Sequence, residues 1–429
     1  MNTQFGINIS GYINKAFGLG VAVRANINAM KAAQIPFAVN DFNIKISENI
    51  GELATENSIS RENPYPVNLV QINPDMLGEV FANVSPEYFK DKYNIAFWAW
   101  ELENFPEASK PFLRFFNEIW VPSSFCSDAV SKVSSVPVIK IMHSIQIGNT
   151  PFTRKDFNLP EDKFIFMTMF DYHSSIDRKN PIGAIDAYEK AFGKNNADTL
   201  LLIKTSISKE FPAQKQRLTE RIGDNQSIVL IEEILDQDKL YSLINCCDSF
   251  VSLHRSEGFG LTMAEAMYLG KPVIATAYSA NTEFMNLNNS FPVKYDLIKT
   301  GNLYSGSTDK DIWADPDTDH AAELMSTIYN DKSLAGKIAK KGQDDVRNFL
   351  APANIGEKIN QRLKIIDQDI LPNLSKSSSN EATLLQFEIK TLKEKLEKIR
   401  SLKPVQWKIK IKNLKNKLTG KDRKYFWED

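Results

Sequence analysis

Short apolar runs alternate with amphipathic segments of helical length along most of the chain. These runs are mostly continuous rather than alternating, as in parallel strands that helices cover on both faces. The pattern predicts two successive sets of βαβ units, and so two doubly wound α/β domains with a cleft between the carboxyl ends of their strands. The candidate strands are 5–9, 35–39, 67–72, 94–100, 118–122 and 137–141, followed by 164–170, 199–203, 227–231, 249–253, 272–276 and a weaker run at 291–294.

The boundary between the two sets falls in a polar stretch at 143–162 that contains Pro and Gly. A chain of 429 residues is long enough for two domains with additional elements. We predict an N-terminal Rossmann-like domain, a C-terminal Rossmann-like domain, a closing helix, a linker and an amphipathic basic tail. Their ranges are 1–155, 156–350, 351–372, 373–384 and 385–429.

The tail repeats hydrophobic residues at helical spacing. The first stripe holds Leu385, Ile389, Leu392, Leu396 and Ile399, and a second stretch places lysines between Trp407, Ile411, Leu414 and Leu418. Residues 376–429 contain 13 Lys and 2 Arg against 7 acidic residues, a net charge of +8, although the whole chain carries −1. The first stripe predicts a short coiled coil for self-association or a partner. The second stretch suits either an anionic membrane surface or a solvated basic helix packed on the negatively charged body.

Composition narrows the class of protein. Hydrophobic residues make up 42% and charged residues 24% of the chain, as in globular proteins. The net charge gives no argument for nucleic acid, and no recognition module accompanies the basic tail. No secretory signal or run of 18 apolar residues is visible. Cys126, Cys246 and Cys247 form no CxxC pair, which favours a reducing cytoplasm, and the four histidines lack metal-ligand spacing.

The stretch 254–276, HRSEGFGLTMAEAMYLGKPVIAT, carries the clearest chemistry. It predicts the end of a strand, a glycine turn at Gly258 and Gly260, a helix and another strand. Free amides near Phe259, Gly260 and Leu261 at the helix start suit an anionic diphosphate. Glu257 and Glu265 suit neutral hydroxyls on either side of it, which describes a sugar nucleotide. The competing interpretation is a solvated Glu257 and a Glu265 that only favours the helix dipole.

These residues resemble the donor-site signature of retaining glycosyltransferases of the GT-B fold, specifically family 4. The resemblance extends in order over most of residues 1–371. It includes FGLGVAVRANINAM (17–30), AFWAWELENFP followed by EIWVPSSF, and MFDYHSSIDRKNPIGAIDAYEKAF. It implies a GT-B fold: two Rossmann-like domains with a cleft between them.

The resemblance also implies roles for the donor-binding candidates. Glu257 would contact the donor sugar, Glu265 the ribose, and the amides of Gly258, Phe259, Gly260 and Leu261 the sugar and diphosphate. Lys179 and Arg178 would neutralise the diphosphate, and Gly18 and Gly20 would face it. Arg178 and Lys179 could equally be a solvated basic pair, and the two glycines a plain strand-to-helix turn. The segment 232–240 corresponds to the part of the family that recognises the base and ribose.

Glu257, Glu101 and Lys179 are the catalytic candidates. Glu101 follows a strand in the region where many family members have a His, so we expect it to contact the reacting sugar or the acceptor; a helix-capping role is the alternative. His254 is either a donor-loop residue or purely structural, and Trp98 and Trp100 either stack on a sugar or pack in the core. In Tyr278–Asn281, Ala280 replaces a glycine of close relatives, which puts the loop geometry in question.

We therefore expect a cytoplasmic retaining hexosyltransferase that uses a nucleoside-diphosphate sugar, with a glycan or lipid-linked acceptor of cell-surface polysaccharide or glycoconjugate synthesis. The nucleotide sugar is a substrate, so no cofactor and no metal are expected. Peripheral contact with the inner face of the cell membrane would come from 385–429. The alternatives are a GT-B sugar-nucleotide epimerase and a non-catalytic sugar-nucleotide-binding or assembly protein.

Overall fold

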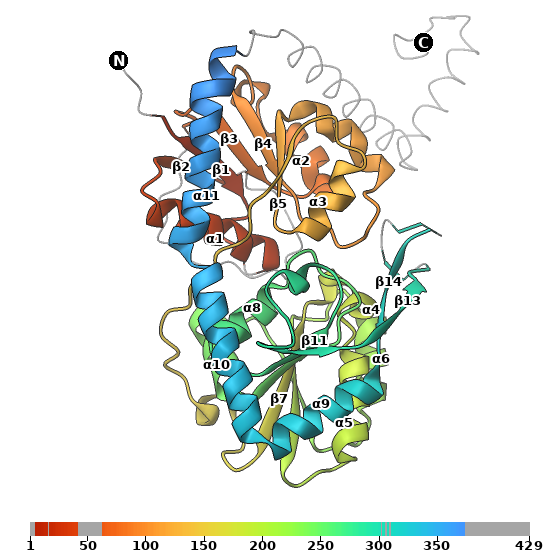
Figure 1. Ribbon diagram of the computed structural model, residues 1–429. Helices are drawn as coiled ribbons and strands as arrows, with labels where there is room; N and C mark the ends of the chain where they lie inside the picture. The colour runs from red at the N-terminus through yellow and green to blue at the C-terminus, as the bar shows by residue number, and fades with distance from the viewer. Residues whose placement is uncertain are drawn as a thin grey trace, which may run out of the picture.

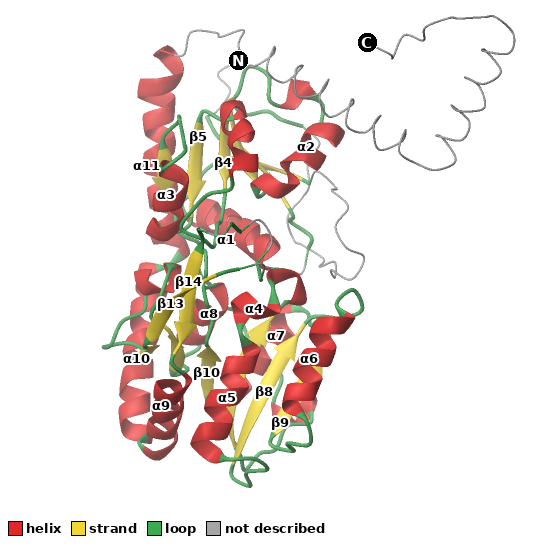
Figure 2. Ribbon diagram, turned by 90° about the vertical axis from the view of Figure 1, so that its right-hand side faces the viewer, coloured by secondary structure: helices red, strands yellow, loops and turns green. Residues whose placement is uncertain are grey.

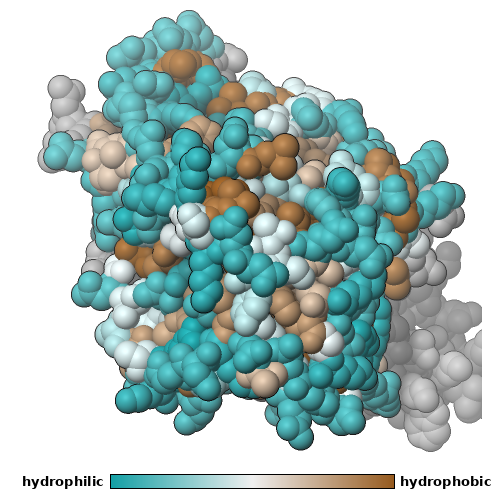
Figure 3. All heavy atoms as spheres, turned by 60° about the horizontal axis from the view of Figure 1, so that its bottom comes forward, coloured by the Kyte–Doolittle hydropathy of each residue, from teal (hydrophilic) through white to brown (hydrophobic). Residues whose placement is uncertain are grey.

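The computed structural model describes residues 5–15, 17–41, 62–301, 303–304, 307–308 and 310–373. They form two α/β domains, which lie one above the other in Figure 1. The predicted tail at 385–429 lies outside these residues, and so does the predicted linker 373–384 apart from residue 373. Within them, no helix is both long and apolar enough to span a bilayer. Seen from the free end of the C-terminal domain, hydrophilic residues cover most of the surface and hydrophobic ones form small separate patches (Figure 3).

The N-terminal domain is built on a six-stranded parallel sheet of order β2-β1-β3-β4-β5-β6. Its strands are β1 (Ile7–Gly11), β2 (Phe37–Asn40), β3 (Val67–Gln71), β4 (Tyr93–Phe97), β5 (Glu118–Val121) and β6 (Val138–Lys140). Its helices are α1 (Gly18–Ala32), α2 (Leu77–Asn83) and α3 (Ser124–Ser131), with 3-10 segments η1 (Pro74–Met76), η2 (Pro86–Tyr88) and η3 (Glu107–Phe115).

The C-terminal domain is built on a second six-stranded parallel sheet, of order β12-β11-β10-β7-β8-β9. Its strands are β7 (Phe164–Phe170), β8 (Thr199–Thr205), β9 (Ile228–Glu232), β10 (Ser249–Ser252), β11 (Val273–Thr276) and β12 (Phe291–Val293). Its helices are α4 (Ile176–Lys179), α5 (Pro181–Phe192), α6 (Pro212–Ile222), α7 (Gln237–Cys246), α8 (Leu261–Tyr268), α9 (Thr318–Asn330) and α10 (Lys332–Phe349). Short segments η4 (Arg154–Phe157), η5 (Tyr172–Ser174) and η6 (Ala280–Glu283) connect them.

Two further parts complete the described chain. An antiparallel hairpin, β13 (Tyr295–Lys299) and β14 (Ile312–Pro316), leaves the C-terminal domain and lies beside the boundary with the N-terminal domain in both ribbon views (Figures 1 and 2). The chain then returns through α11 (Pro352–Ile365), followed by the π-helical η7 (Ile366–Ile370) and the 3-10 segment η8 (Leu371–Asn373). In Figure 1, α10 runs along the C-terminal domain and α11 along the N-terminal domain.

The prediction of two doubly wound domains is confirmed, and the differences concern details. β4 ends at Phe97, so the predicted strand 94–100 stops early; Trp98 is wholly buried and stacks on Phe105 with ring centroids 5.5 Å apart. The sequence pattern does not predict β13 and β14. All five residues of β13 are exposed, so this strand has no apolar face from which burial could be inferred.

Three buried asparagines connect the central strands of the N-terminal sheet. Asn8 of β1 donates to Asn68 of β3 at 2.9 Å, and Asn68 donates to Asn94 of β4 at 2.8 Å. The same residues are register partners in the parallel ladder. Because a shift by one residue would leave these buried amides unpaired, the asparagine ladder favours one strand register.

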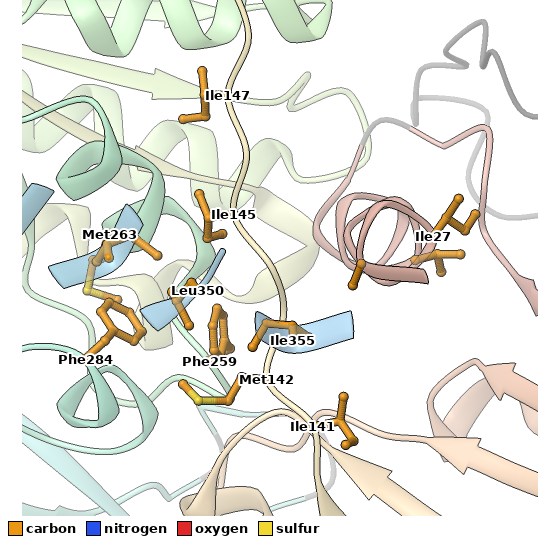
Figure 4. Packing of buried hydrophobic residues seen from close by; sticks show 14 of the residues in the cluster. Ile27, Ile141, Met142, Ile145, Ile147, Phe259, Met263, Phe284, Leu350 and Ile355 are labelled. Atoms are coloured by element: carbon orange, nitrogen blue, oxygen red, sulfur yellow. The ribbon is translucent and has the colours of Figure 1, made fainter. Parts of the chain in front are cut away.

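A hydrophobic cluster spans the boundary between the two domains (Figure 4). The crossing segment after β6 supplies Ile141, Met142 and Ile145, which lie between α1 of one domain and Phe259 and Met263 of the other. The backbone is also fastened here, since the amide of residue 145 donates to the carbonyl at residue 350 at 2.8 Å. Apolar packing therefore joins the domains on the side where α10 meets α11.

Helix α11 is held on the N-terminal domain by close packing and by a buried ion pair. A Cβ at Gly356 would collide with the backbone of Ala29 in α1, so only glycine permits this approach. Arg362 donates from Nε to both oxygens of Glu118 at 3.0 and 3.1 Å, and Glu118 in β5 is completely buried. Tyr93 donates to the same carboxylate at 3.1 Å. The C-terminal helix is thus part of the N-terminal domain's core.

We predict that Arg362→Met strongly destabilises the protein. The variant leaves the buried Glu118 carboxylate without its cation, which typically costs about 3–5 kcal/mol of unfolding free energy. Urea unfolding at neutral pH measures the loss. Lys364→Met, on an exposed position of the same helix, is the matched control and should stay within about 0.5 kcal/mol of wild type. Equal losses in both variants would contradict the ion-pair argument.

Candidate active site

The two sheets direct their topological switch points toward each other. In the C-terminal sheet the order reverses between β7 and β10, and in the N-terminal sheet between β1 and β3. Open α/β sheets bind ligands outside the carboxyl ends of the strands at such a point. The loops concerned follow β7 (171–180), β10 (253–260) and β1 (12–17), and they carry most of the candidate site residues.

Asn180 fixes the loop after β7 against the end of β10. It has a left-handed backbone conformation with φ of 51°, and its side chain donates to the carbonyl of Leu253 at 2.9 Å. Its Oδ1 also caps α5 by accepting from the amide of Gly183 at 3.0 Å. This residue follows the short helix α4 directly, so it positions Arg178 and Lys179 beside the 254–260 turn.

Four charged side chains meet at this point. Lys179 forms an ion pair with Glu257, and Arg178 lies 3.5 Å from Glu257 and 3.6 Å from Glu101. Arg178 is only 4% exposed and donates to the backbone carbonyls of Ser174 at 3.2 Å and Ser256 at 2.9 Å. We call Glu101, Arg178, Lys179 and Glu257 the charge cluster.

The charge cluster keeps Glu257 ionised. Burial alone would raise the pKa of its carboxyl, but the charges of Lys179 and Arg178 outweigh burial and lower that pKa to about 2. Burial works against the charge on Arg178 as well, yet Glu101 and Glu257 hold the pKa of the guanidinium above its ordinary value. The cluster is therefore two full positive charges balanced by carboxylates.

Glu101 enters the charge cluster from the N-terminal domain. Its loop after β4 contacts the donor-side turn, since the Glu101 carbonyl accepts from Ser256. The segment after β5 adds a second contact, because the Gly258 carbonyl accepts from Ser123 at 2.8 Å. A Cβ at Gly258 would lie 3.2 Å from the carbonyl oxygen of Trp100. Gly258 thus lets the N-terminal loop approach the turn closely.

Glu265 lies apart from the charge cluster, in a cavity of about 30 Å³ between the domains. Arg24 and Asn28 of α1 line this cavity, and so do Gln237 and Tyr241 of α7. Tyr241 donates to Glu265 at 3.1 Å. Burial raises the pKa of the Glu265 carboxyl to about 7, against the Tyr241 hydrogen bond and the charge of Arg24. Gln237 belongs to the 232–240 segment that the resemblance connects with the base and ribose.

Gly18 and Gly20 both lie in the first turn of α1 but in different surroundings. A Cβ at Gly20 would collide with the carbonyl oxygens of Lys15 and Tyr12, the latter at 2.9 Å. A Cβ at Gly18 would meet no atom within 4 Å. Gly20 is required for packing of the loop before α1, whereas Gly18 leaves open space at the helix start.

The other candidate residues of the 254–261 segment differ in what surrounds them. His254 is fully buried: its Nε2 lies 3.1 Å from Asn281 Oδ1, its Nδ1 lies 3.1 Å from the Ser252 carbonyl, and burial lowers its pKa. Both ring nitrogens are thus engaged inside the C-terminal domain. Phe259 packs edge-on against His143 at 5.0 Å. Gly260 caps α8 with φ of 95°, and Leu261 begins that helix.

Two smaller predictions also have a structural outcome. In the 278–281 loop the positive φ of 68° belongs to Ser279, and Ala280 begins η6, so alanine at 280 causes no strain there. Trp100 is partly exposed and donates from Nε1 to the Asn104 carbonyl at 2.8 Å, within its own loop. Arg24, Tyr241 and Tyr304 also border the site, although none is a site candidate from the sequence. Arg24 lies within the stretch 17–30 and Tyr241 directly after 232–240, whereas no motif contains Tyr304.

Among the residues that the structure describes, no group of three His, Cys, Asp or Glu side chains is close enough to hold a metal ion. The Asp-Pro-Asp sequence at 315–317 illustrates why. Asp317 caps α9 by accepting from the amides of Asp319 and His320, and Asp315 pairs with Arg255 at 2.9 Å.

Comparison with known proteins agrees with this geometry. Residues 149–345 match the family described as glycosyl transferases group 1. The segment 149–345 thus resembles this family of glycosyl transferases.

An O-antigen biosynthesis glycosyltransferase, WclY of Escherichia coli, is 25% identical over 199 residues, which is 46% of this chain and 50% of WclY. The chain therefore spans about half the length of this curated relative. The fold resembles sucrose-phosphate synthase of Thermosynechococcus elongatus, with a TM-score of 0.62, 16% identity, and coverage of 85% of this chain and 99% of that one. It also resembles Anabaena HepE in complex with UDP and glucose, with a TM-score of 0.56, 13% identity, and coverage of 84% and 100%. The predicted GT-B arrangement of two Rossmann-like domains is confirmed.

The segment 149–345 that matches this family contains every candidate that follows β7, including Lys179, Glu257 and Glu265. The candidates Gly18, Gly20 and Glu101 belong to the N-terminal domain, outside the family match. Both domains therefore contribute to the candidate site.

The two glycines of α1 offer a matched pair of variants. Gly20→Ala should lower the unfolding free energy by about 1–3 kcal/mol because its Cβ has no space. Gly18→Ala should change that energy by less than about 0.5 kcal/mol. Chemical denaturation measures both. If Gly18 faces the diphosphate, Gly18→Ala should still weaken nucleotide-sugar binding; equal destabilisation by the two alanines would refute the packing argument.

The raised pKa of the Glu265 carboxyl predicts that the affinity for a nucleotide sugar depends on pH. Hydroxyl donors of a ribose need the ionised carboxylate, whose fraction grows as pH rises through about 7. Affinity for UDP-glucose or GDP-mannose should therefore increase about ten-fold from pH 6 to pH 8, as a single group of this pKa dictates. Their diphosphates do not titrate in this range, unlike a phosphate monoester. Calorimetry measures the affinity, and Glu265→Gln should bind more weakly without this pH dependence.

Proposed function

We propose that this protein is a glycosyltransferase that moves a hexose from a nucleoside-diphosphate sugar to a glycan or lipid-linked acceptor with retention of anomeric configuration. The observation that carries the proposal is the arrangement of Lys179, Glu257 and Glu265 around the start of α8. One cation and two carboxylates lie at the switch point of the C-terminal sheet, facing the N-terminal domain.

Each group suits one part of the donor. Lys179, with a side chain 17% exposed, pairs with Glu257, and the further N–H donors of its ammonium group could bind a diphosphate. Glu257 stays ionised and accepts hydrogen bonds from sugar hydroxyls. Glu265 and Tyr241 would take the ribose, with Arg24 of α1 closing that pocket. Positive charge near the diphosphate also stabilises the leaving group as the glycosidic bond breaks.

Arg178 has a different part in this proposal. Its guanidinium already donates to two backbone carbonyls, so it supports the site through its charge and through the shape of the 256–257 turn. Its guanidinium is also buried, so direct contact of Arg178 with phosphate would need the surrounding turn to open. Lys179 is therefore the main phosphate ligand in our proposal.

Glu101 would face the reacting sugar or the acceptor, because it approaches the charge cluster from the N-terminal side. The known proteins support the substrate class: the E. coli relative is an O-antigen glycosyltransferase, and HepE was obtained with UDP and glucose. A polysaccharide or glycoconjugate acceptor follows from the first of these.

The donor would require the site to widen. The cavity at Glu265 holds about 30 Å³, whereas sites for small molecules have about 300–1,000 Å³. The contacts that close the site are hydrogen bonds between loops, such as Tyr278 to Glu103 at 3.1 Å and Asn104 to Asp311 at 2.9 Å. Water can replace hydrogen bonds of this kind at small net cost.

Saturation-transfer NMR against UDP-glucose, UDP-N-acetylglucosamine, GDP-mannose and ADP-glucose tests the proposal. We expect one donor to bind, and Lys179→Ala and Glu265→Gln to weaken it by roughly ten-fold or more, the size of a lost hydrogen bond to a charged group. Lys190→Ala is the control, since Lys190 lies on the exposed surface of α5 and pairs with Asp319. Its affinity should equal that of wild type.

The outcome separates the alternatives. Transfer to an acceptor or slow donor hydrolysis, with the product anomer determined by NMR, identifies a retaining transferase. Conversion of one nucleotide sugar into its epimer identifies an epimerase, and binding without turnover a non-catalytic protein. If no donor binds to the folded wild-type protein, the proposed function is wrong.

A further inference from the structure

Tyr304 lies in the connection between β13 and β14, far along the chain from every motif of the donor site. The hairpin belongs to the C-terminal domain and lies beside the boundary with the N-terminal domain in both ribbon views (Figures 1 and 2). The Tyr304 hydroxyl donates to Oε2 of Glu101 at 2.8 Å. This bond joins two domains through residues 203 positions apart.

The Tyr304 ring is held by three neighbours. The Arg178 guanidinium lies 5.8 Å from the ring centroid, within the range of a cation–π contact. Trp100 and Trp313 contact the ring edge-to-face, with centroids 6.2 and 6.4 Å away. The neighbouring backbone is also fixed, since the Leu303 carbonyl accepts from Ser175 at 3.3 Å. These contacts determine where the hydroxyl points.

We propose that Tyr304 is a positioning residue that holds the Glu101 carboxylate against Arg178 across the domain boundary. The two oxygens of Glu101 divide their contacts: Oε2 accepts from Tyr304, and Oε1 faces Arg178 at 3.6 Å. A carboxylate bound at both oxygens has a fixed orientation. This inference rests on the proposed function only for its effect on turnover.

The protonation state of Tyr304 agrees with a donor role. Burial, followed by the charge of Glu101, raises the pKa of Tyr304 well above its ordinary value, so the hydroxyl keeps its proton. Asn104 adds a second bond from the same N-terminal loop to the hairpin, donating to Asp311 at 2.9 Å. The hairpin connection thus fastens the 98–105 loop at Glu101 and at Asn104.

The hydrogen bond from Tyr304 to Glu101 affects the site because Glu101 pairs with Arg178. Arg178 needs the Glu101 charge to remain paired in a buried place, and Arg178 in turn shapes the turn at Glu257. Removing the Tyr304 hydroxyl should therefore disturb the reacting centre. Nucleotide binding should be preserved, because within the part of the chain that the structure describes neither Lys179 nor Glu265 is hydrogen-bonded to Tyr304.

Tyr304→Phe removes the hydroxyl and keeps the ring; Tyr329→Phe is the matched control. Tyr329 is a partly buried tyrosine of α9 whose ring packs on Phe164 and Phe192. Three quantities are measured: Kd for UDP, GDP and ADP, kcat for hydrolysis of the sugar nucleotide that the NMR panel selects, and hydrogen exchange of peptides within 98–105 without nucleotide.

We expect Tyr304→Phe to lower kcat about ten-fold or more, as for a lost hydrogen bond to a charged group, with Kd for the nucleotide unchanged. Exchange in 98–105 should rise several-fold. The double variant with Glu101→Gln should have a kcat no lower than Glu101→Gln alone, because coupled residues are not additive. Tyr329→Phe should match wild type throughout.

The remaining outcomes either contradict the inference or separate it from the proposed function. Unchanged exchange or unchanged kcat in Tyr304→Phe overturns it, and so does a weaker nucleotide Kd that accounts for the whole loss, since Tyr304 would then be a donor ligand. If wild type binds no nucleotide sugar, the proposed function fails. In that case the exchange of 98–105 alone decides whether Tyr304 positions the Glu101 loop.

Discussion

A buried guanidinium between two carboxylates is the constraint on which the site depends. Arg178 is 4% exposed, and a charge that is removed from water in this way is stable only when opposite charges and hydrogen-bond acceptors surround it. Glu257 comes from the same domain and Glu101 from the other. The charge balance of the site therefore includes the position of the N-terminal domain, and the two domains are coupled through electrostatics as well as through packing.

This coupling explains why the donor-side turn is built around glycine. The charge cluster requires the loop after β4 to approach within contact distance of the 256–258 backbone. A Cβ at Gly258 would press against Trp100, and Ser123 already donates to the Gly258 carbonyl. From the sequence alone, this glycine is expected to let the backbone approach a ligand. In this structure the neighbour that needs the space is the protein's own N-terminal loop.

The sequence predicts the local elements of the site well and its long-range contacts poorly. The strands β7 and β10, the glycine turn and the helix with Glu265 follow from short apolar runs and turn residues that are adjacent in the chain. Glu118 and Arg362 are 244 positions apart, and nothing in either neighbourhood indicates that they pair. The contact of Tyr304 is equally hard to predict from the sequence. This residue lies in a polar connection of an exposed hairpin, so neither hydrophobic periodicity nor a motif distinguishes it. Gly18 and Gly20 look equivalent in sequence, and only the packing of the preceding loop separates them.

The two sides of the domain boundary differ in chemistry, and this difference determines where the molecule can open. On the side of α10 and α11, apolar residues such as Met142 and Phe259 pack together, and separating them would expose hydrophobic surface to water (Figure 4). On the side of the β13–β14 hairpin, the contacts between the domains include hydrogen bonds such as that from Asn104 to Asp311 at 2.9 Å. Water and counter-ions replace such contacts at far smaller net cost. Opening would therefore begin at the hairpin side, with the junction of α10 and α11 as its hinge. Tyr304 lies on the opening side, where a single hydrogen bond can couple closure of the domains to the alignment of the charge cluster.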